Sequence, residues 1–533
     1  MSFLKRHIGI LIVLFLSFWA VRPLFAPGFF PMHDDTQVAR VFEMGKMLSR
    51  GIFPVRWVPD LGYGYGYPIF NFYAPLAYYV GGILTLVGFD ALIATKLMMG
   101  IGILLSGVFM YLLAREFWGE PGGIISGLFY VYAPYHALDI YVRGDVAEFW
   151  AYAFVPLIFL GFYKVFYSSP SRSRFATPRR WQVFDLDSFE VDVGSVWKWI
   201  TVGSFGYAAV ILSHNLTAMM VTPLLAIVIL LYYYIGYKKN KLFIIHYSLF
   251  IILLGLATSA FYWIPALLEM KYTNVLSQIG GGADFRDHFV CIQQLWSSPW
   301  GFGGSAPGCI DGLSFKIGKL HILLAALTAC FLILTQLFRK KGTLKQVQHD
   351  TKISVWFSIF GLLISIFLML EISKPIWQTI PQMAFFQYPW RFLLLASFFS
   401  SLLSGAIVWL LTIYLGGVLR LPPRWVTATS FVILIFWVIY FNSKFFQPQT
   451  IALKTAGDYT NEYALKWTAS KISDEYMPRD FKKPKSEYEI AKEPAILPQE
   501  TAVQKISNII SMIGVLALII GIIKFRRRLA INE

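Results

Sequence analysis

Long runs of apolar residues, separated by short polar stretches, repeat along the whole chain. The hydrocarbon core of a bilayer is about 30 Å thick, so a helix needs roughly 20 mostly apolar residues to cross it. Runs of this kind lie near 8–26, 95–114, 121–140, 147–167, 197–213, 216–236, 243–264, 319–338, 353–371, 392–415, 425–442 and 506–524. The pattern predicts an all-α polytopic membrane protein with about 12 transmembrane helices.

Composition agrees with this pattern. The chain is 57% hydrophobic and only 14% charged, whereas soluble domains are about 25% charged. This excludes a soluble globular enzyme and a disordered chain. The formal net charge is +16; on so apolar a chain, excess Lys and Arg indicates cytoplasmic loops rather than nucleic-acid binding. We expect a plasma-membrane protein with no nucleic-acid partner.

The apolar run 74–90 is shorter than the others and opens with Ala74-Pro75. Lys and Arg favour the cytoplasmic side of short loops. The basic clusters near 172–180, 238–241 and 339–341 all fall inside only if 74–90 does not cross the membrane. We therefore expect a short re-entrant or interfacial helix at 74–90 and two cytoplasmic termini.

This topology divides the chain into three parts. Residues 1–442 form the transmembrane domain, with outside loops at 27–73 and 265–318. Residues 443–505, rich in Lys, Glu and Pro, form a small or partly ordered extracytoplasmic segment. Residues 506–533 form a final transmembrane helix and a basic cytoplasmic tail.

Three cysteines are too few for a zinc ribbon or a disulfide scaffold. Cys291 and Cys309 share the outside loop 265–318, where a disulfide could form in an oxidising compartment. Cys330 lies in a predicted span and should be free.

The first outside loop is the most informative stretch. His33, Asp34 and Asp35 precede a run at 36–49 whose apolar residues share one face, which predicts an amphipathic helix on the membrane surface. Asp34 or Asp35 could cap that helix, and Gly51 would follow its end. Capping explains one carboxylate, but it leaves a second beside a histidine at the mouth of a membrane cavity.

An aromatic, glycine-rich loop follows at 62–68 and contains Tyr65 and Tyr67. Its rings could stack on the faces of sugars. They could equally belong to an interfacial belt, where Trp and Tyr are enriched.

The second polar cluster lies between two predicted spans and contains Asp139, Arg143, Asp145 and Glu148. Charges beside a span are costly unless they are paired or face a wet cavity. They could form a local ion pair. Alternatively, Arg143 could bind a phosphate while a carboxylate orients an acceptor or a metal.

Three further polar sets fall on the same side under this topology. They are Ser213-His214-Asn215, the group Asp284, Arg286, Asp287 and His288, and the run Gln387-Tyr388-Pro389-Trp390-Arg391. Each could be a helix-packing hydrogen bonder. Their convergence on one side favours a shared site.

Several of these motifs together resemble a known pattern. They are His33-Asp34 continuing through Arg40 and Arg56-Trp57 to Tyr73, Tyr141-Val-Arg143-Gly-Asp145-x-x-Glu148, and Gln387 to Phe392, with Ser213-His214-Asn215 between. Across residues 30–400 the chain resembles the bacterial membrane family labelled 6-pyruvoyl-tetrahydropterin synthase-related. That family is similar to the YfhO-like group within the GT-C superfamily of polytopic glycosyltransferases.

The resemblance implies a GT-C-like fold and a sugar taken from a polyprenyl-phosphate donor. It implies that Asp34 is the catalytic carboxylate, with Asp35 as its rival and His33 beside it. The expected substrate-binding residues are Arg143, Asp145, Glu148, His214, Asn215, Tyr65, Tyr67, Gln387 and Arg391.

We therefore expect an inverting membrane glycosyltransferase that acts on an extracytoplasmic glycan, lipid or protein. A divalent cation, Mg²⁺ or Mn²⁺, could lie between Asp34 and Asp145. The alternatives are a transporter or flippase of lipid-linked glycans and a non-catalytic membrane assembly protein.

Overall fold

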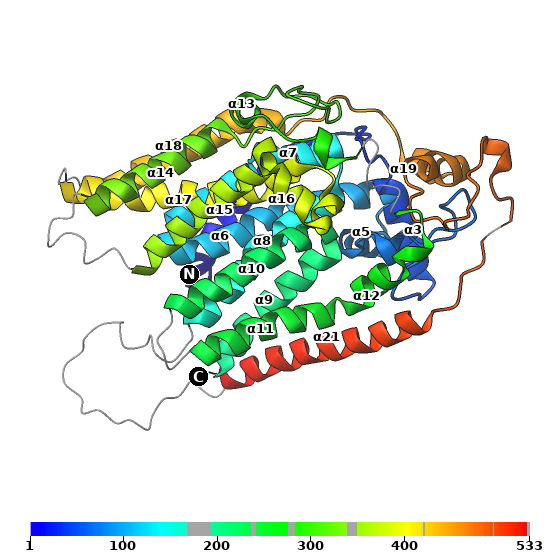
Figure 1. Cartoon of the computed structure of the whole chain (residues 1–533), viewed down its shortest axis with the longest axis horizontal. Coiled ribbons are helices and arrows are strands. Elements are labelled where there is room, and N and C mark those ends of the chain that lie inside the picture. The colour runs from blue at the N-terminus through cyan, green and yellow to red at the C-terminus, as the bar shows by residue number, and fades with distance from the viewer. Residues whose placement is uncertain are drawn as a thin grey trace. The chain divides into compact units, whose positions relative to one another are not determined.

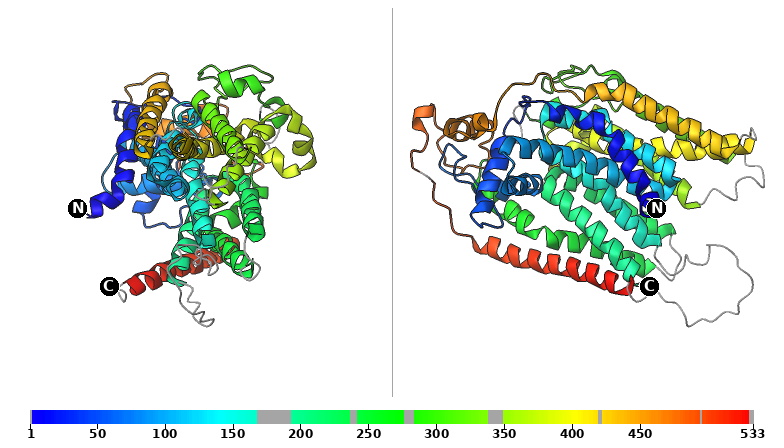
Figure 2. Two further views of the ribbon diagram at one scale, coloured as in Figure 1. Left: turned by 90° about the vertical axis from the view of Figure 1, so that its left-hand side faces the viewer. Right: turned by 180° about the vertical axis from the view of Figure 1, so that it is seen from behind.

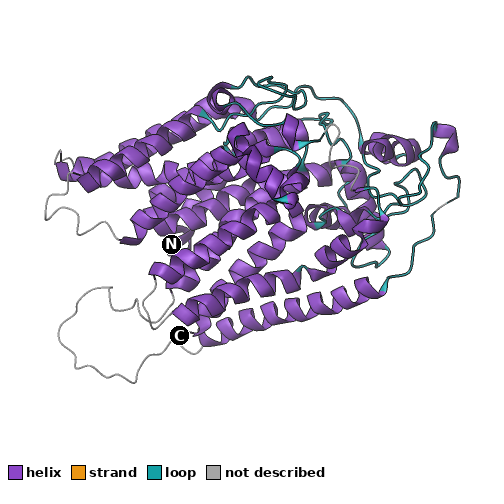
Figure 3. Cartoon of the chain, viewed as in Figure 1, coloured by secondary structure: helices purple, strands orange, loops and turns teal. Residues whose placement is uncertain are grey.

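The computed structural model describes residues 2–167, 193–235, 241–275, 283–337, 349–418, 422–493 and 495–529. The basic clusters expected near 172–180, 238–240 and 339–341 lie outside these residues. Over the described ranges the structure is helical, with isolated β-bridges and no strand (Figure 3).

Within the described ranges, nine helices are long and apolar enough to cross a membrane, or ten if the bent pair His7–Leu16 and Phe18–Phe25 is one span. One of the nine, Ala91–Arg143, contains two of the predicted spans. The shorter apolar helix Lys319–Leu334 matches another. The prediction of an all-α, multi-pass membrane protein is confirmed, and the described residues of each predicted apolar run are largely helical.

The chain forms two compact units. The first comprises Met1–Ile69, Ala77–Ala153 and Met270–Leu497. Its helices are α1 (Ser2–Leu16), α2 (Phe18–Val21), α3 (Gln37–Ser49), α5 (Leu76–Leu86), α6 (Ala91–Val131), α7 (Pro134–Leu138), α13 (Ile292–Ser297), α14 (Lys319–Leu337), α15 (His349–Met369), α16 (Lys374–Thr379), α17 (Leu393–Val418), α18 (Pro423–Asn442), α19 (Ala456–Thr460) and α20 (Ser470–Ile472).

Helix α17 is the core of the first unit and packs against α6, α14, α15 and α18 (Figure 1). Seen from behind, α1 lies along α6 (Figure 2). Gly405 of α17 meets Gly122 of α6 so closely that a Cβ on Gly405 would lie 2.3 Å from the Gly122 carbonyl oxygen. Two glycines therefore let these helices approach backbone to backbone. Within α6, Gly119 has φ +71° and Pro121 follows, which marks a kink between two predicted spans.

The second unit comprises Phe70–Leu76, Phe154–Glu269 and Pro498–Glu533. Its helices are α4 (Ile69–Phe72), α9 (Val193–Ser213), α10 (Asn215–Ile235), α11 (Lys241–Thr258), α12 (Ala260–Glu269) and α21 (Ala502–Leu529), and α8 (Val146–Tyr167) runs from the first unit into it. Helix α21 lies along α9, α11 and α12 (Figure 1).

Helix α5 has 11 residues, which at 1.5 Å per residue is about 16 Å, roughly half of the hydrocarbon core. It covers most of the run 74–90. A re-entrant or interfacial position for this run stays a prediction.

Helix α3 forms where the sequence of the first outside loop predicts it. The prediction for its C-terminal end is confirmed, and the prediction for its N-terminal cap is wrong. Gly51 follows the helix with φ +74°, and the Ile52 N–H donates to the Met47 carbonyl, as expected for a glycine-terminated helix. The predicted aspartate cap is wrong, because the N-cap is Thr36 and makes no side-chain cap hydrogen bond. The Asp34 backbone N–H instead donates to the Arg143 carbonyl at 3.0 Å.

The polar face of α3 is buried rather than exposed to solvent. Arg40 and Glu43 are both buried, and Arg40 donates to the Tyr78 hydroxyl at 3.3 Å and to the Ser473 hydroxyl at 2.9 Å. Ser473 belongs to the segment 443–493 of the first unit, which contacts the first loop through Ser470 and Ser473. Covering by this segment explains why α3 is buried more completely than its amphipathic pattern predicts.

Candidate active site

Backbone hydrogen bonds join the first outside loop, at His33 and Asp34, to the second polar cluster, at Val142 and Arg143. The His33 N–H donates to the Val142 carbonyl at 3.1 Å, and the Asp34 N–H donates to the Arg143 carbonyl at 3.0 Å. Gly144 has φ +66°, and a Cβ there would lie 2.1 Å from the Met32 sulfur. The glycine therefore permits both the turn and the close approach of the first loop.

Arg143 ends the π-helical turn Asp139–Arg143 and is buried among carboxylates. Its Nη2 donates to Asp145 Oδ2 at 2.7 Å, and its Nη1 donates to Glu148 Oε2 at 3.0 Å. The same Nη1 is also paired with Asp139. The guanidinium group lies 4.8 Å from the centre of the Trp390 ring. Arg143 is thus held by three carboxylates and an aromatic ring.

Arg391 joins this cluster from the short helix Pro389–Phe392. Its Nη1 donates to Glu148 Oε2 at 2.5 Å and lies 3.4 Å from Asp145 Oδ2. The predicted convergence of the second loop with the run at 387–391 therefore holds for Arg391. Gln387 lies in the same segment, half-buried, with φ +62°.

The arginine cluster, as we call Asp139, Arg143, Asp145, Glu148 and Arg391, contains two cations and three carboxylates. Of the two alternatives left open by the sequence, the local ion pair is present. Both Nη atoms of Arg143 already donate to carboxylates, so a phosphate would have to compete with them for these atoms. Sequence reasoning missed Tyr135, which donates to Glu148; its place four residues before Asp139 on a helical segment was the available signal.

Asp34 lies beside this cluster and differs from its members. Its side chain is half-buried, and no donor among the described residues hydrogen-bonds to its carboxylate. Burial raises the pKa of Asp34, and the Asp145 charge raises it further, while Arg40, Arg143 and Arg391 lower it. The arginine cluster therefore acts electrostatically on a carboxylate whose oxygens remain available.

Asp35 faces a different environment. Burial raises the pKa of Asp35, and Lys454 lowers it, with no contribution from the arginine cluster. His33 is exposed, and its Nε2 lies 3.0 Å from the Phe302 carbonyl oxygen. Of the two rival aspartates, Asp34 is the one coupled to the second loop.

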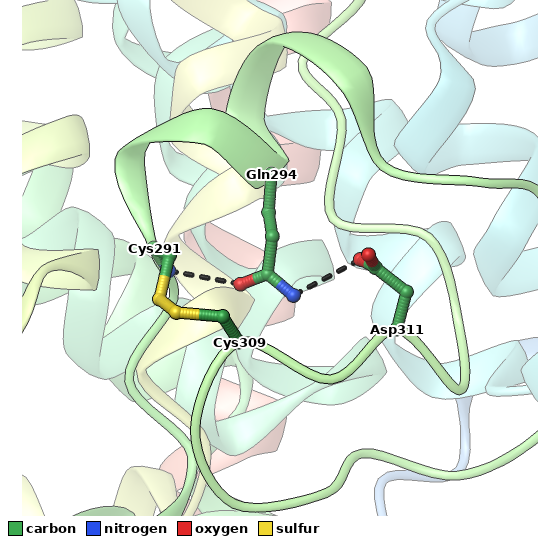
Figure 4. Close-up of a disulfide and its surroundings, with 4 residues drawn as sticks. All are labelled: Cys291, Gln294, Cys309 and Asp311. Atoms are coloured by element: carbon green, nitrogen blue, oxygen red, sulfur yellow. Dashed lines mark hydrogen bonds between the residues drawn. A yellow bond between two sulfur atoms is a disulfide. The ribbon is translucent and has the colours of Figure 1, made fainter.

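A disulfide closes the loop that contacts His33. Cys291 and Cys309 are bonded, with their Cα atoms 5.6 Å apart (Figure 4), and Cys330 is free. Inside this loop the Ser305 hydroxyl accepts from Trp390 Nε1 at 3.1 Å and lies 2.8 Å from His288 Nδ1. The loop thus holds the tryptophan that covers Arg143. Nearby, Arg286 pairs with Asp284 at the surface.

The aromatic loop is largely covered by the chain itself. Tyr67 is fully buried, and its hydroxyl contacts Ser473 Oγ at 3.3 Å and accepts the Tyr476 N–H at 3.3 Å. Tyr65 is 51% exposed, and its hydroxyl donates to the Glu489 carbonyl. Of these two predicted sugar-binding rings, Tyr65 alone reaches the surface.

His214 and Asn215 lie in the second unit, at the break between α9 and α10. His214 Nδ1 lies 2.8 Å from the Thr217 hydroxyl. Their predicted role in substrate binding stays a prediction.

The carboxylates of the site are compatible with a divalent cation, since Mg²⁺ and similar ions prefer oxygen ligands. Asp34 has available oxygens. Asp145 is engaged at both oxygens, because Oδ1 accepts the Glu148 N–H at 3.0 Å and Oδ2 accepts from Arg143. Asp34 therefore fits a ligand role better than Asp145.

Comparisons with known proteins identify neighbours by structure. No family model and no curated protein matches the chain, so the resemblance to the pterin-labelled family stays a prediction. Archaeal oligosaccharyltransferase AglB from Archaeoglobus fulgidus, in complex with an inhibitory peptide and a dolichol-phosphate, is 13% identical, with a TM-score of 0.46 over 93% of this chain and 62% of that one.

Two bacterial enzymes are also similar. Arabinofuranosyltransferase AftD from Mycobacteria is 12% identical, with a TM-score of 0.45 over 84% of this chain and 27% of that one. ArnT from Cupriavidus metallidurans, bound to undecaprenyl phosphate, is 11% identical, with a TM-score of 0.32 over 84% of this chain and 90% of that one. These neighbours are GT-C glycosyltransferases. The chain spans about three fifths of the length of the oligosaccharyltransferase.

Proposed function

We propose that this protein is an inverting membrane glycosyltransferase that moves a sugar from a polyprenyl-phosphate donor to an extracytoplasmic glycan, lipid or protein. The observation that carries the proposal is the position of Asp34. Its carboxylate has no protein donor in the described ranges, yet it lies within the electrostatic reach of Arg40, Arg143 and Arg391.

In the proposed reaction Asp34 is the general base. It takes the proton of an acceptor hydroxyl, the hydroxyl oxygen forms a bond to the anomeric carbon, and the bond from that carbon to the phosphate oxygen breaks. The phosphate leaves with the electron pair. A base whose pKa is raised by burial binds the proton more strongly than an exposed aspartate does.

The arginine cluster positions this base. The backbone of Arg143 accepts the N–H of Asp34, and the ion pairs of Arg143 fix that backbone. A divalent cation, if one binds, would add positive charge for the departing phosphate. In this scheme Asp145 and Glu148 hold the arginines rather than the acceptor.

We place the site on the outer face of the membrane, with both termini cytoplasmic. The support is chemical: disulfides persist in oxidising compartments, and the loop closed by Cys291 and Cys309 contacts His33.

The test compares Asp34→Asn with Asp35→Asn in a sugar-transfer assay with polyprenyl-phosphate donors. We expect Asp34→Asn to lose at least about 10²-fold in rate, the usual minimum for a general base, and Asp35→Asn to stay near wild type. Expression and thermal stability of both variants serve as controls. Transfer retained by both variants would end the proposal.

A further inference from the structure

Three lysines gather where α14 begins and α18 ends. Lys319 is the first residue of α14, Lys316 precedes it by three residues, and Lys444 lies two residues beyond α18. All three belong to the first unit. Figure 1 shows both helix ends near α13, and Lys316 on one side contacts the ring of Phe445 on the other. We call Lys316, Lys319 and Lys444 the lysine cluster.

Aromatic rings bring the ammonium groups together. Lys316 Nζ lies 4.6 Å from the centre of the Phe445 ring, and Lys444 Nζ lies 5.5 Å from the same centre. The Trp300 ring packs on Phe445 with their centres 4.9 Å apart, and Lys319 Nζ lies 5.7 Å from the Trp296 ring. Two of the positive charges thus share one ring.

No carboxylate neutralises these charges within the part of the chain that is described. None of the three lysines forms an ion pair there. Asp311 is the nearby acid, but it accepts hydrogen bonds from Gln294 Nε2 at 3.0 Å and from the Ser298 hydroxyl at 2.5 Å (Figure 4). Both bonds end on Oδ1 of Asp311, and the carboxylate forms no ion pair with the three lysines.

The charges of the lysine cluster repel one another. Burial together with the charges of Lys444 and Lys319 lowers the pKa of Lys316 to about 8, against a smaller opposing effect of Asp311. Cation–π contacts at exposed sites contribute only about 0.5–1 kcal/mol each. They hold the side chains in place without removing the excess positive charge.

The surroundings are those of a membrane surface. The helices α14 and α18 are apolar, and Leu323 and Phe441 on them are 48% and 45% exposed. On the outer face that the proposed function assigns to this end of the helices, Lys and Arg are depleted, so three lysines there favour a role in binding an anion. A phosphate at the lipid–water boundary supplies one, and its acyl or isoprenoid chain would follow the apolar helices.

We propose that the lysine cluster binds the phosphate group of a lipid in the outer leaflet, with the lipid chain against α14 and α18. The leaflet rests on the proposed function. The connection to the candidate active site is short: Trp300 is two residues from Phe302, whose carbonyl contacts His33. The lysine cluster thus provides the unpaired positive charge that the arginine cluster lacks.

The experiment uses the full chain in phosphatidylcholine nanodiscs, titrated with undecaprenyl phosphate in one arm and phosphatidylglycerol in the other. The test variant is the triple Lys316→Gln, Lys319→Gln, Lys444→Gln, and the triple change to Arg keeps the charge. The matched control changes Lys482, Lys485 and Lys492 to Gln, three exposed lysines of the same unit.

We expect the first triple variant to bind lipid phosphate at least tenfold more weakly, with the Arg variant and the matched control near wild type. Weakening for undecaprenyl phosphate alone would identify a carrier-lipid site, and weakening in both arms a general outer-leaflet phosphate site. Wild-type affinity in the Gln variant for both lipids would overturn the proposal.

The same assay separates this site from the proposed function. Asp34→Asn should lose transfer and keep its lipid affinity. If lysine-dependent binding is found while the wild type transfers no sugar, the proposed function fails and the lipid site stands. If transfer depends on Asp34 while binding is independent of the lysines, the lipid site alone fails.

Discussion

The arginine cluster and the lysine cluster of the first unit carry the same sign of charge in opposite settings. Arg143 and Arg391 are buried and matched by three carboxylates. Lys316, Lys319 and Lys444 lie at helix ends among aromatic rings, and none of them has an ion pair in the described ranges. Cations whose partners are already built in hold the structure together, whereas cations without partners can bind a ligand.

The energetic reason lies in desolvation. Removing one partner from a buried ion pair leaves an uncompensated charge and typically costs about 3–5 kcal/mol. An exposed lysine keeps most of its hydration. The comparison therefore makes different predictions for stability at the two clusters, and these are given from the largest effect to the smallest.

Arg143→Ala should be the most damaging change. It leaves Asp139, Asp145 and part of Glu148 without their shared cation, so we expect a loss of about 3–5 kcal/mol in stability. Thermal unfolding of the purified protein measures it. Arg286→Ala, which removes an exposed ion pair with Asp284, is the control and should cost less than about 1 kcal/mol. If Arg143→Ala and Arg286→Ala lower the stability equally, Arg143 does not stabilise the fold as we expect.

Glu43→Gln tests a buried carboxyl group that, unlike those of the arginine cluster, is not paired with an arginine. Burial and a hydrogen bond with Asp60 raise the pKa of Glu43 from its ordinary 4.5 to about 8. The folded chain therefore holds a proton that the unfolded chain loses above about pH 4.5, and stability should fall as pH rises toward 8 by at most about 1.4 kcal/mol per pH unit.

The Gln variant should be more stable than wild type near pH 8 and should lose this pH dependence. Unfolding curves at several values between pH 5 and pH 8 measure both effects. A wild type whose stability rises across that interval, or a variant with the same slope as wild type, contradicts the assignment.

Lys316→Gln should have the smallest effect on stability. It removes a charge that its neighbours disfavour, so the free energy of unfolding should change by less than about 0.5 kcal/mol, as at ordinary surface positions. The same unfolding assay detects it. Destabilisation comparable with that of Arg143→Ala would show that the lysine cluster is structural and would remove the contrast between the two clusters.

Much of the fold was predictable because apolar runs of bilayer length have few alternatives to helix. Gly51, at the end of α3, was predictable for a local reason, since left-handed backbone favours glycine. The N-cap of α3 was not, since Thr36 takes that position. The Asp34 N–H donates to the carbonyl of Arg143, more than a hundred residues away in the sequence, and no local pattern shows this contact.

The site was predictable in its membership more than in its roles. Spacing along the chain brought Arg143, Asp145 and Glu148 together, but it could not show that their charges satisfy one another. The burial of Tyr67 depends on residues 473 and 476, far along the sequence. The lysine cluster depends on the meeting of two helix ends, which no local pattern encodes.

The most direct test of the central claim is a structure of the full chain with a bound isoprenoid phosphate. Our account predicts the phosphate on the face that carries Asp34 and the disulfide loop, in contact with the lysine cluster, while Arg143 keeps its three carboxylates. A phosphate seated against Arg143 in place of Asp145 or Glu148, or bound at the opposite ends of α14 and α18, would contradict it.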